Sequence, residues 1–413
     1  MTVGSTGAVR EDSAAPDAPP VVVYAVTVAR SAVVLLRGQL AAMRAQGYRV
    51  VVICSPEDGI DLDGFAAAQG VEVVPLPMTR GLASPADVRS LVAAVRVLRR
   101  LRPSIVNAST PKAGLVVGLA ARLAGVPVRI YSLWGLRLEG ERPGSLRYRL
   151  LHAAERVTCA LSTTVLCASG SLRDRAVELR LVDEDRTRVL GRGSTNGIDL
   201  DRYRPATPDE IAAAKVGAGF PQEAFVVGFV GRLVADKGIG ALLVAFETLA
   251  HDVDARLLLV GDLDAADPLP AELDRRIRAD PRIHVTGAVP DPARWYPAMD
   301  VFVLPSRREG LPNVLLEAAA CALPTVTTTA TGCPDAVGGE RAEDGRTGIV
   351  VGVDDADALG NALVGLAGQP GERRRLGVAG RAFVERHFAQ DVVWDRVAGL
   401  YRELRGERRR AGG

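Results

Sequence analysis

Histidine and cysteine are scarce in this chain of 413 residues, which contains four His and five Cys. The cysteines are odd in number and form no C-x-x-C pair, so they predict neither a disulfide framework nor a zinc site. None of the histidines lies beside a second metal-ligating residue in the sequence. We therefore expect reduced thiols in a cytoplasmic protein, and no bound metal.

Long apolar segments are also missing. The most apolar stretch, residues 21–43, is interrupted by Arg30 and Arg37, whereas a transmembrane helix needs about 20 apolar residues. Residues 1–20 are small, acidic and rich in Pro and Ala, without the apolar centre of a signal peptide, and we interpret them as a disordered leader. Any membrane contact is then expected to be peripheral, at the inner face.

An excess of one charge sign is absent, since the net charge is only +2, and this gives no reason to expect nucleic acid as a partner. No G-x-G-x-x-G follows the first predicted strand, which argues against a dehydrogenase. Lysine is rare: only Lys112, Lys215 and Lys237 occur among 51 basic residues. Two of the three lie in candidate site loops. Because lysine carries a compact point charge and arginine a planar guanidinium, lysine there can mark a site that needs a compact charge.

What is present is a regular alternation of strand-like and helical segments in a chain too long for one core, which predicts two domains. In residues 87–101, for example, apolar residues recur every three or four positions, as in an amphipathic helix. Near-continuous apolar runs such as 257–260 are typical of parallel strands covered on both faces. Runs rich in β-branched residues predict strands at 21–28, 49–54, 71–76, 104–108, 128–132, 163–168 and 188–191, and again at 225–230, 256–260, 284–286, 301–304, 325–328 and 348–351.

The fold class expected is α/β, with two Rossmann-like doubly wound domains facing an interdomain cleft, where ligands of such sheets bind. Periodicity fades between residues 193 and 222, which marks the joint. We place an acceptor-side domain at 21–200 and a donor-binding domain at 201–385. A helix with a basic tail, 386–413, is expected to cross back to the first domain.

Segment 231–238 carries Gly231, Arg232 and Lys237 in the loop that leaves a predicted strand and enters a helix. Two cations at the carboxyl edge of a sheet can neutralise a diphosphate, and stabilising leaving-group charge is the main task in glycosyl transfer. Taken alone, the same residues are more consistent with ordinary surface charges.

Segment 309–317 places two carboxylates, Glu309 and Glu317, around a Gly-Leu-Pro turn. Proline favours the first position of a helix, so we expect the helix to start at Pro312 with the amides of Asn313 and Val314 pointing outward. Such a helix end binds phosphate. Glu309 can then face a sugar, and Glu317 can accept the hydroxyls of a ribose. The alternative interpretation is a helix that merely starts with an acidic residue and carries an exposed Glu without function. The presence of segment 231–238 upstream argues against that alternative.

These segments, with 285–287, 332–335, 347–348 and 196–203 in support, resemble the family 4 retaining glycosyltransferases of GT-B fold. The resemblance covers about residues 21–400. It implies that Arg232 and Lys237 hold the diphosphate of the donor, that Glu309 contacts the donor sugar, and that Glu317 contacts the ribose. Catalytic roles fall on Glu309, Arg232 and Lys237. The other donor contacts it implies are Gly231, Gly287 near the base, Gly310, Leu311, Asn313 and Val314.

Segments 109–114 and 129–137 resemble the capsular-polysaccharide-type branch, which includes enzymes that extend lipid-diphosphate-linked sugars. Acceptor candidates are Ser31, Lys112, Trp134 and Arg137, with Lys112 and Arg137 expected to face the cleft. Trp134 stands where many relatives carry His, and Ala322 where Gly is usual. Residues 129–156 hold six Arg against three Glu, which suits a phosphate-bearing acceptor or a membrane surface, or simply amphipathic helices in an arginine-rich protein.

The expected activity is retaining transfer of a hexose or N-acetylhexosamine from a nucleoside-diphosphate sugar, with UDP preferred, and without cofactor or metal. The expected acceptor is a hydroxyl of a polyprenyl-diphosphate-linked or polysaccharide-precursor sugar. Alternatives are transfer to a small soluble acceptor such as an aminocyclitol, a sugar-nucleotide epimerase or phosphorylase, and a non-catalytic nucleotide-sugar sensor.

Overall fold

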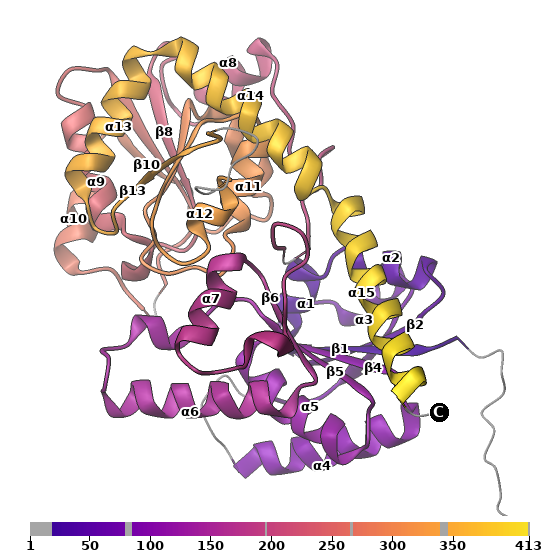
Figure 1. Cartoon of the computed structure of the whole chain (residues 1–413). Helices are drawn as coiled ribbons and strands as arrows, with labels where there is room; N and C mark the ends of the chain where they lie inside the picture. The colour runs from indigo at the N-terminus through magenta and orange to yellow at the C-terminus, as the bar shows by residue number, and fades with distance from the viewer. Residues whose placement is uncertain (1–18, 79–84, 195, 265–266, 339–345, 412–413) are drawn as a thin grey trace, which may run out of the picture.

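The computed structural model describes residues 19–78, 85–194, 196–264, 267–338 and 346–411, which form two parallel sheets wrapped by helices (Figure 1). Most of the expected leader, residues 1–18, lies outside the described residues. The two sheets lie one above the other in the view of Figure 1, with the loops at the carboxyl ends of their strands between them. The α/β expectation is therefore confirmed, and the neighbouring strands described in both sheets pair in parallel.

The first sheet has seven strands in the order β3-β2-β1-β4-β5-β6-β7. The pairing register of the strands shows which residues share a face of this sheet, and therefore which helices cover that face. Val23 of β1 pairs with Val106 of β4, and Ala108 with Tyr131 of β5, so these residues share the face that packs against α4, α5 and α6. The opposite face, with Tyr24, packs against α1, α2 and the last helix, α15 (Gln390–Ala411). The strands are β1 Val21–Val28, β2 Arg49–Ser55, β3 Glu72–Pro75, β4 Ile105–Ser109, β5 Val128–Leu133, β6 Thr164–Cys167 and β7 Thr187–Arg188, and the helices are α1 Ala29–Leu35, α2 Gln39–Ala45, α3 Leu62–Gln69, α4 Pro85–Leu101, α5 Pro111–Leu123, the 3₁₀ turn η1 Arg137–Gly140, α6 Leu146–Leu161, α7 Gly170–Glu178 and the 3₁₀ turn η2 Glu184–Arg186.

The second sheet has six strands in the order β10-β9-β8-β11-β12-β13. Its central strands are entirely buried, as the apolar runs predict. The strands are β8 Phe225–Val230, β9 Ala255–Val260, β10 Ile283–Val285, β11 Val301–Leu304, β12 Thr325–Thr328 and β13 Ile349–Val351, and the helices are α8 Pro208–Gly217, the 3₁₀ turn η3 Ala235–Lys237, α9 Ile239–Leu249, α10 Ala271–Ala279, the 3₁₀ turn η4 Pro292–Ala298, α11 Asn313–Ala320, α12 Cys333–Ala336, α13 Ala356–Gly368, α14 Pro370–His387 and α15 Gln390–Ala411.

One predicted strand is shorter in the structure, and one helix of the structure was not predicted. The strand expected at 188–191 is only Thr187–Arg188, because Leu190 leaves the sheet and packs against the cluster that includes α15. The joint 193–222 contains a helix, α8, whose start is fixed by a capping box between Thr207 and Glu210. Its Ala-rich sequence gives no clear apolar stripe, so only the capping pattern marks it.

The last helix, α15, returns from the second domain and packs on the first sheet (Figure 1). Its Tyr401 hydroxyl donates to the Tyr24 hydroxyl at 2.9 Å and accepts from Asn107 at 2.9 Å. Trp394 donates to Asn196 at 3.0 Å, which ties the same helix to the joint between the domains. Of the arginines expected in the basic tail, Arg402 is exposed and Arg405 half-buried, while the side chains of residues 407–411, including Arg408, Arg409 and Arg410, are not among those described.

Ala322 follows α11 in the left-handed region, with φ of 56°. A residue with a Cβ is strained there by about 1–2 kcal/mol, whereas glycine is not. This backbone geometry explains why glycine is usual at this position in the family that the sequence resembles.

Candidate active site

The donor-side candidates lie on two loops that meet because their strands, β8 and β11, are neighbours in the sheet. Lys237 Nζ lies 2.5 Å from Glu309 Oε1, and Ser306 Oγ donates to the same oxygen at 2.8 Å. Both side chains are mostly buried, with exposed fractions of 23% for Lys237 and 14% for Glu309. Two residues 72 positions apart in the sequence thus form one charge-paired unit at the carboxyl edge of the second sheet.

A second set of contacts clamps the same two loops. Arg308 Nε donates to Asp236 at 2.8 Å, and the Arg307 amide donates to the Asp236 carbonyl at 2.9 Å. Gly238 is in the left-handed region with φ of 71°, and a Cβ there would lie 1.9 Å from the Pro305 carbonyl oxygen. The close approach of the two loops therefore requires glycine at this position.

The helix after Glu309 begins one residue later than predicted, because Pro312 is the N-cap and α11 runs from Asn313. The turn Gly310–Leu311 remains between Glu309 and the helix, with Leu311 buried. Asn313 and Val314 form the first turn of α11, where amide groups and the helix dipole favour an anion.

Glu317 is held on the inner side of α11 by two tyrosines that the sequence analysis missed. The Tyr296 hydroxyl donates to Glu317 Oε2 at 2.7 Å. Burial raises the pKa of Glu317, while hydrogen bonds from Tyr296 and Tyr203 and the nearby Arg202 lower it. Glu317 and Glu309 therefore sit in different surroundings, the first among hydroxyls and the second beside an ammonium group. No motif in the sequence links either tyrosine to this carboxylate.

Arg232 is on the same loop as Lys237 but pairs with a different carboxylate, Asp264, at 2.5 Å. It remains 62% exposed. The structure therefore brings Lys237 and Glu309 together, while Arg232 lies beside them as an exposed cation with its own partner.

Glycines line the neighbouring strand ends. A Cβ at Gly261 would lie 1.9 Å from the Gly231 carbonyl oxygen, and Gly261 bridges to Gly287. Gly287 has φ of 68° with open space around its missing side chain. Gly261, which the sequence analysis did not single out, thus packs between the two glycines that it did.

The first domain closes over this site through backbone contacts. A Cβ at Gly310 would lie 1.8 Å from the Trp134 carbonyl oxygen, so the two main chains touch. The buried Ser169 Oγ donates to the Gly310 carbonyl at 2.6 Å. Ser171 and the Gly170 amide donate to Asp335, and the Gly332 amide donates to Ser171. None of the serine contacts was predicted, since they join residues more than 140 positions apart.

The acceptor candidates are spread over the first domain. Ser31 is half-buried in α1, which follows β1 directly. Arg137 is exposed in η1. Lys112 is only 8% exposed, and its Nζ lies 2.6 Å from Asp87 Oδ2 of α4, so it is engaged inside the helix layer.

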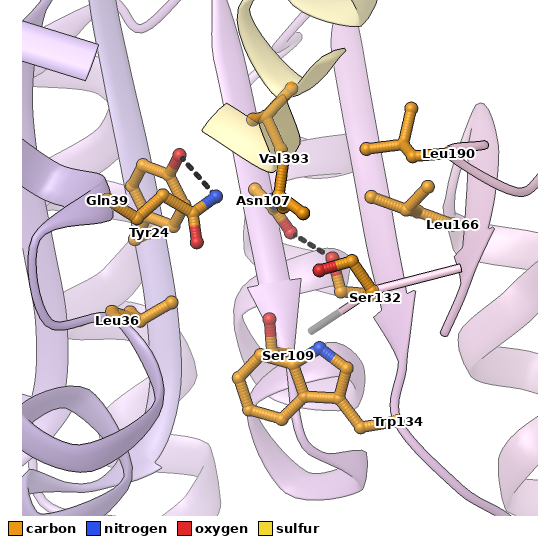
Figure 2. A pocket seen from close by; sticks show the side chains of 12 residues that line it. Tyr24, Leu36, Gln39, Asn107, Ser109, Ser132, Trp134, Leu166, Leu190 and Val393 are labelled. Atoms are coloured by element: carbon orange, nitrogen blue, oxygen red, sulfur yellow. Dashed lines mark hydrogen bonds between the residues drawn. The ribbon is translucent and has the colours of Figure 1, made fainter. Parts of the chain in front are cut away.

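Trp134 joins the two sides of the cleft. Its carbonyl contacts Gly310, while its ring lies beside Ser109 at the rim of a small polar cavity (Figure 2). Inside, Ser132 donates to Asn107 Oδ1 at 2.7 Å, and among the described residues Gln39 Oε1 and Ser194 Oγ have no hydrogen-bond partner. The free space of about 20 Å³ is room for a water molecule but not for a sugar ring.

In the described part of the chain, no three His, Cys, Asp or Glu side chains gather as a metal site would require. Within the same residues, no helix is both long and apolar enough to cross a bilayer. The arrangement can hold an anionic ligand between Lys237, Arg232 and the start of α11, with carboxylates placed for hydroxyl groups.

Comparison with known proteins identifies two matching families along the chain. Residues 32–193 match the family described as "Glycosyl transferase 4-like domain", and residues 224–369 match "Glycosyl transferases group 1". The capsular polysaccharide biosynthesis glycosyltransferase CapM of Staphylococcus aureus is 31% identical over 379 residues, covering 92% of this chain and 96% of CapM.

Two further proteins are similar. The UDP-Gal:alpha-D-GlcNAc-diphosphoundecaprenol alpha-1,3-galactosyltransferase of Escherichia coli is 27% identical, covering 70% of this chain and 72% of that protein. The crystal structure of Anabaena HepE in complex with UDP and glucose superposes with a TM-score of 0.74 at 18% identity, covering 93% of this chain and 100% of the other. At that identity the likeness shows the fold alone, and it confirms the two facing α/β domains.

Proposed function

We propose a specific reaction for this chain, which belongs to the group 1 glycosyl transferases, has a GT4-like first domain and is a glycosyltransferase of GT-B fold. The enzyme transfers a hexose or N-acetylhexosamine from a UDP-sugar to a hydroxyl of a polyprenyl-diphosphate-linked sugar, with retention of configuration. CapM, by its name, acts in capsular polysaccharide biosynthesis, and the Escherichia coli relative, by its name, uses a diphosphoundecaprenol-linked acceptor. These names support polysaccharide assembly and a lipid-linked acceptor.

The observation that carries the donor side of the proposal is the Lys237–Glu309 pair beside the start of α11. A diphosphate entering there meets the Lys237 ammonium, the Arg232 guanidinium and the first amides of the helix. Glu309 then accepts hydroxyl groups of the sugar, and Glu317 accepts those of the ribose. These groups stabilise the charge on the departing diphosphate without requiring a divalent ion.

The proposed step is a same-face displacement. The bond between the sugar's anomeric carbon and the diphosphate oxygen breaks, and the acceptor oxygen bonds to that carbon from the same side. The acceptor proton passes to the leaving phosphate oxygen. Closure of the first domain against Gly310 excludes water and brings the acceptor to the donor.

Donor protection tests the proposal most directly. The protein is melted with UDP, GDP, ADP or TDP, then with individual UDP-sugars, each with and without EDTA. A ligand at 100 times its Kd stabilises the folded state by about 2.7 kcal/mol. We expect a UDP-specific shift that EDTA does not change and that Lys237→Ala abolishes. Turnover in Lys237→Ala should fall by about 100-fold or more.

Activity within a few-fold of wild type in Lys237→Ala would remove that residue from the mechanism. The acceptor is tested separately, by offering a polyprenyl-diphosphate-linked sugar and a soluble aminocyclitol in parallel. Transfer to the soluble compound alone would replace the lipid-linked acceptor by the soluble one. UDP-sugar protection without transfer to either acceptor would refute both acceptor assignments.

A further inference from the structure

The outward face of α6 carries large apolar side chains that nothing in the described structure covers. Leu146, Leu150 and Val157 are 74%, 50% and 50% exposed, and their spacings of four and seven residues place them along one stripe. Single exposed apolar residues are ordinary on soluble proteins. Three exposed apolar residues in one line on a 16-residue helix form a continuous apolar stripe instead.

The charges on this stripe are all of one sign. Arg149 and Arg156 are exposed on the same face, and neither forms an ion pair within the described residues. The helix has a single acidic residue, Glu155, and this points inward, where it accepts from the Tyr131 hydroxyl at 2.6 Å. An exposed helix face with leucines and arginines but no carboxylate is the composition of a helix that lies in an anionic membrane interface.

A similar set of exposed side chains lies on α4, which is separated from α6 by α5. Val88 and Val92 are 63% and 43% exposed on that helix, with Arg89 and Arg96 exposed between and after them. Helices α4 and α6 both pack against α5 on the same face of the first sheet, so their outer faces point away from the sheet together (Figure 1). We call the exposed residues Val88, Val92, Leu146, Arg149, Leu150, Arg156 and Val157 the α4–α6 surface.

The position of this surface suits a lipid-linked substrate. Helices of a parallel α/β sheet run back against the strands, so their first turns lie at the carboxyl edge, where the cleft is. Val88 and Val92 lie in the first half of α4, and Leu146 and Leu150 in the first two turns of α6. Helix α6 follows η1, so the loop that carries Trp134 and Arg137 leads directly from the cleft to this surface.

We propose that the α4–α6 surface docks on an anionic lipid bilayer. The apolar side chains enter the interface between headgroups and acyl chains, and the unpaired arginines bind lipid phosphates. This inference rests on the proposed function, because it gives a polyprenyl-linked acceptor a route from the bilayer to the cleft. Arg129 is not part of this surface and cannot bind lipid phosphates in the same way, because its guanidinium donates to the carbonyls of Leu161 and Val126.

Vesicle binding tests the surface with the full-length protein. Co-sedimentation is measured with vesicles of phosphatidylcholine alone and of phosphatidylcholine mixed with phosphatidylglycerol, at low and high salt. The test variant carries Leu150→Glu and Arg156→Glu. The control carries Val378→Glu and Arg374→Glu, which change an exposed Val and an exposed Arg on α14 of the second domain.

We expect the wild type and the control to bind the anionic vesicles and not the neutral ones, with binding weakened by salt. The test variant should bind at least about tenfold more weakly, because it removes one basic side chain and places two carboxylates against an anionic surface. Its thermal unfolding should match that of the control, because all four substituted side chains are exposed.

Equal binding of the test variant and the control would overturn the inference, and so would salt-independent binding to both kinds of vesicle. Loss of a dimer in the test variant, with no vesicle binding by the wild type, would assign the surface to a second copy instead. The proposed function is judged by a different result. Transfer to a lipid-linked acceptor by a protein that binds no vesicles contradicts only this inference, whereas vesicle binding without transfer contradicts only the function.

Discussion

Replacing Gly310 by alanine adds one methyl group where the two domains touch. That Cβ would lie 1.8 Å from the carbonyl oxygen of Trp134, 2.5 Å from its carbonyl carbon and 3.0 Å from the Gly135 amide nitrogen. These are main-chain atoms and cannot rotate away. Gly310 has no left-handed φ, so alanine fits the local backbone, and the damage is confined to the contact between domains.

The displacement can be estimated from the same contact. Cβ atoms do not approach other heavy atoms closer than 3.0 Å, so the main chains must separate by at least about 1.2 Å from their present position. The hydrogen bond from Ser169 Oγ to the Gly310 carbonyl, now 2.6 Å, is on the same contact and will be disturbed. A misplacement of about 1 Å in an active site can reduce the rate about 100-fold.

The assay separates closure from donor binding. We expect kcat of Gly310→Ala to fall about 100-fold while the Kd of UDP, measured by calorimetry, stays within a few-fold of wild type. Gly365→Ala is the matched control, since Gly365 lies in α13 with nothing within 4 Å of its missing Cβ. A wild-type kcat would refute the argument from closure. A large loss of UDP affinity would show instead that Gly310 is needed for the approach of the ligand.

Three further variants probe the rest of the structure. Glu317→Ala should raise the donor KM more than it lowers kcat in steady-state assays, and an unchanged donor KM would count against ribose binding. Burial raises the pKa of Glu155 to about 7, above its ordinary 4.5, so the folded state holds a proton that the unfolded state releases between those pH values. Stability should therefore fall by about 3 kcal/mol as pH rises through that window, and Glu155→Gln should remove this fall in melts from pH 4.5 to pH 8. Ala322→Gly should raise the melting temperature, since it relieves a left-handed φ worth about 1 kcal/mol; a lower melting temperature would contradict the strain.

Strands and loop positions follow well from the sequence because they depend on local patterns. The apolar run at 257–260 becomes the buried part of β9, and Lys237 and Glu309 fall on loops after neighbouring strands, as expected. The helix start was misplaced by one residue only, since Pro312 is suited both to the first helical position and to the cap before it.

Partners distant in the sequence could not be predicted in this way. Lysine at 112 was expected to face the cleft, but Asp87 on a neighbouring helix pairs with it, and no sequence period reports such a contact. Glu317 was expected to be open to a ribose, yet its surroundings are set by Tyr296, which comes from a turn 21 residues earlier. Long-range packing decides which polar groups face a ligand, so spacing alone identifies the loop but not its contacts.

The Lys237–Glu309 pair explains how the site can be stable without its donor and still bind it. A mostly buried ammonium or carboxylate without a partner is strongly unfavourable, and here each neutralises the other. We infer that the donor exchanges these partners instead of adding to them: the diphosphate takes Lys237, and sugar hydroxyls replace the ammonium at Glu309, where Ser306 already donates. Removing one member leaves the other unpaired in the empty site, so Lys237→Ala should weaken the fold as well as the reaction, whereas the double variant Lys237→Ala/Glu309→Ala should recover stability without recovering turnover.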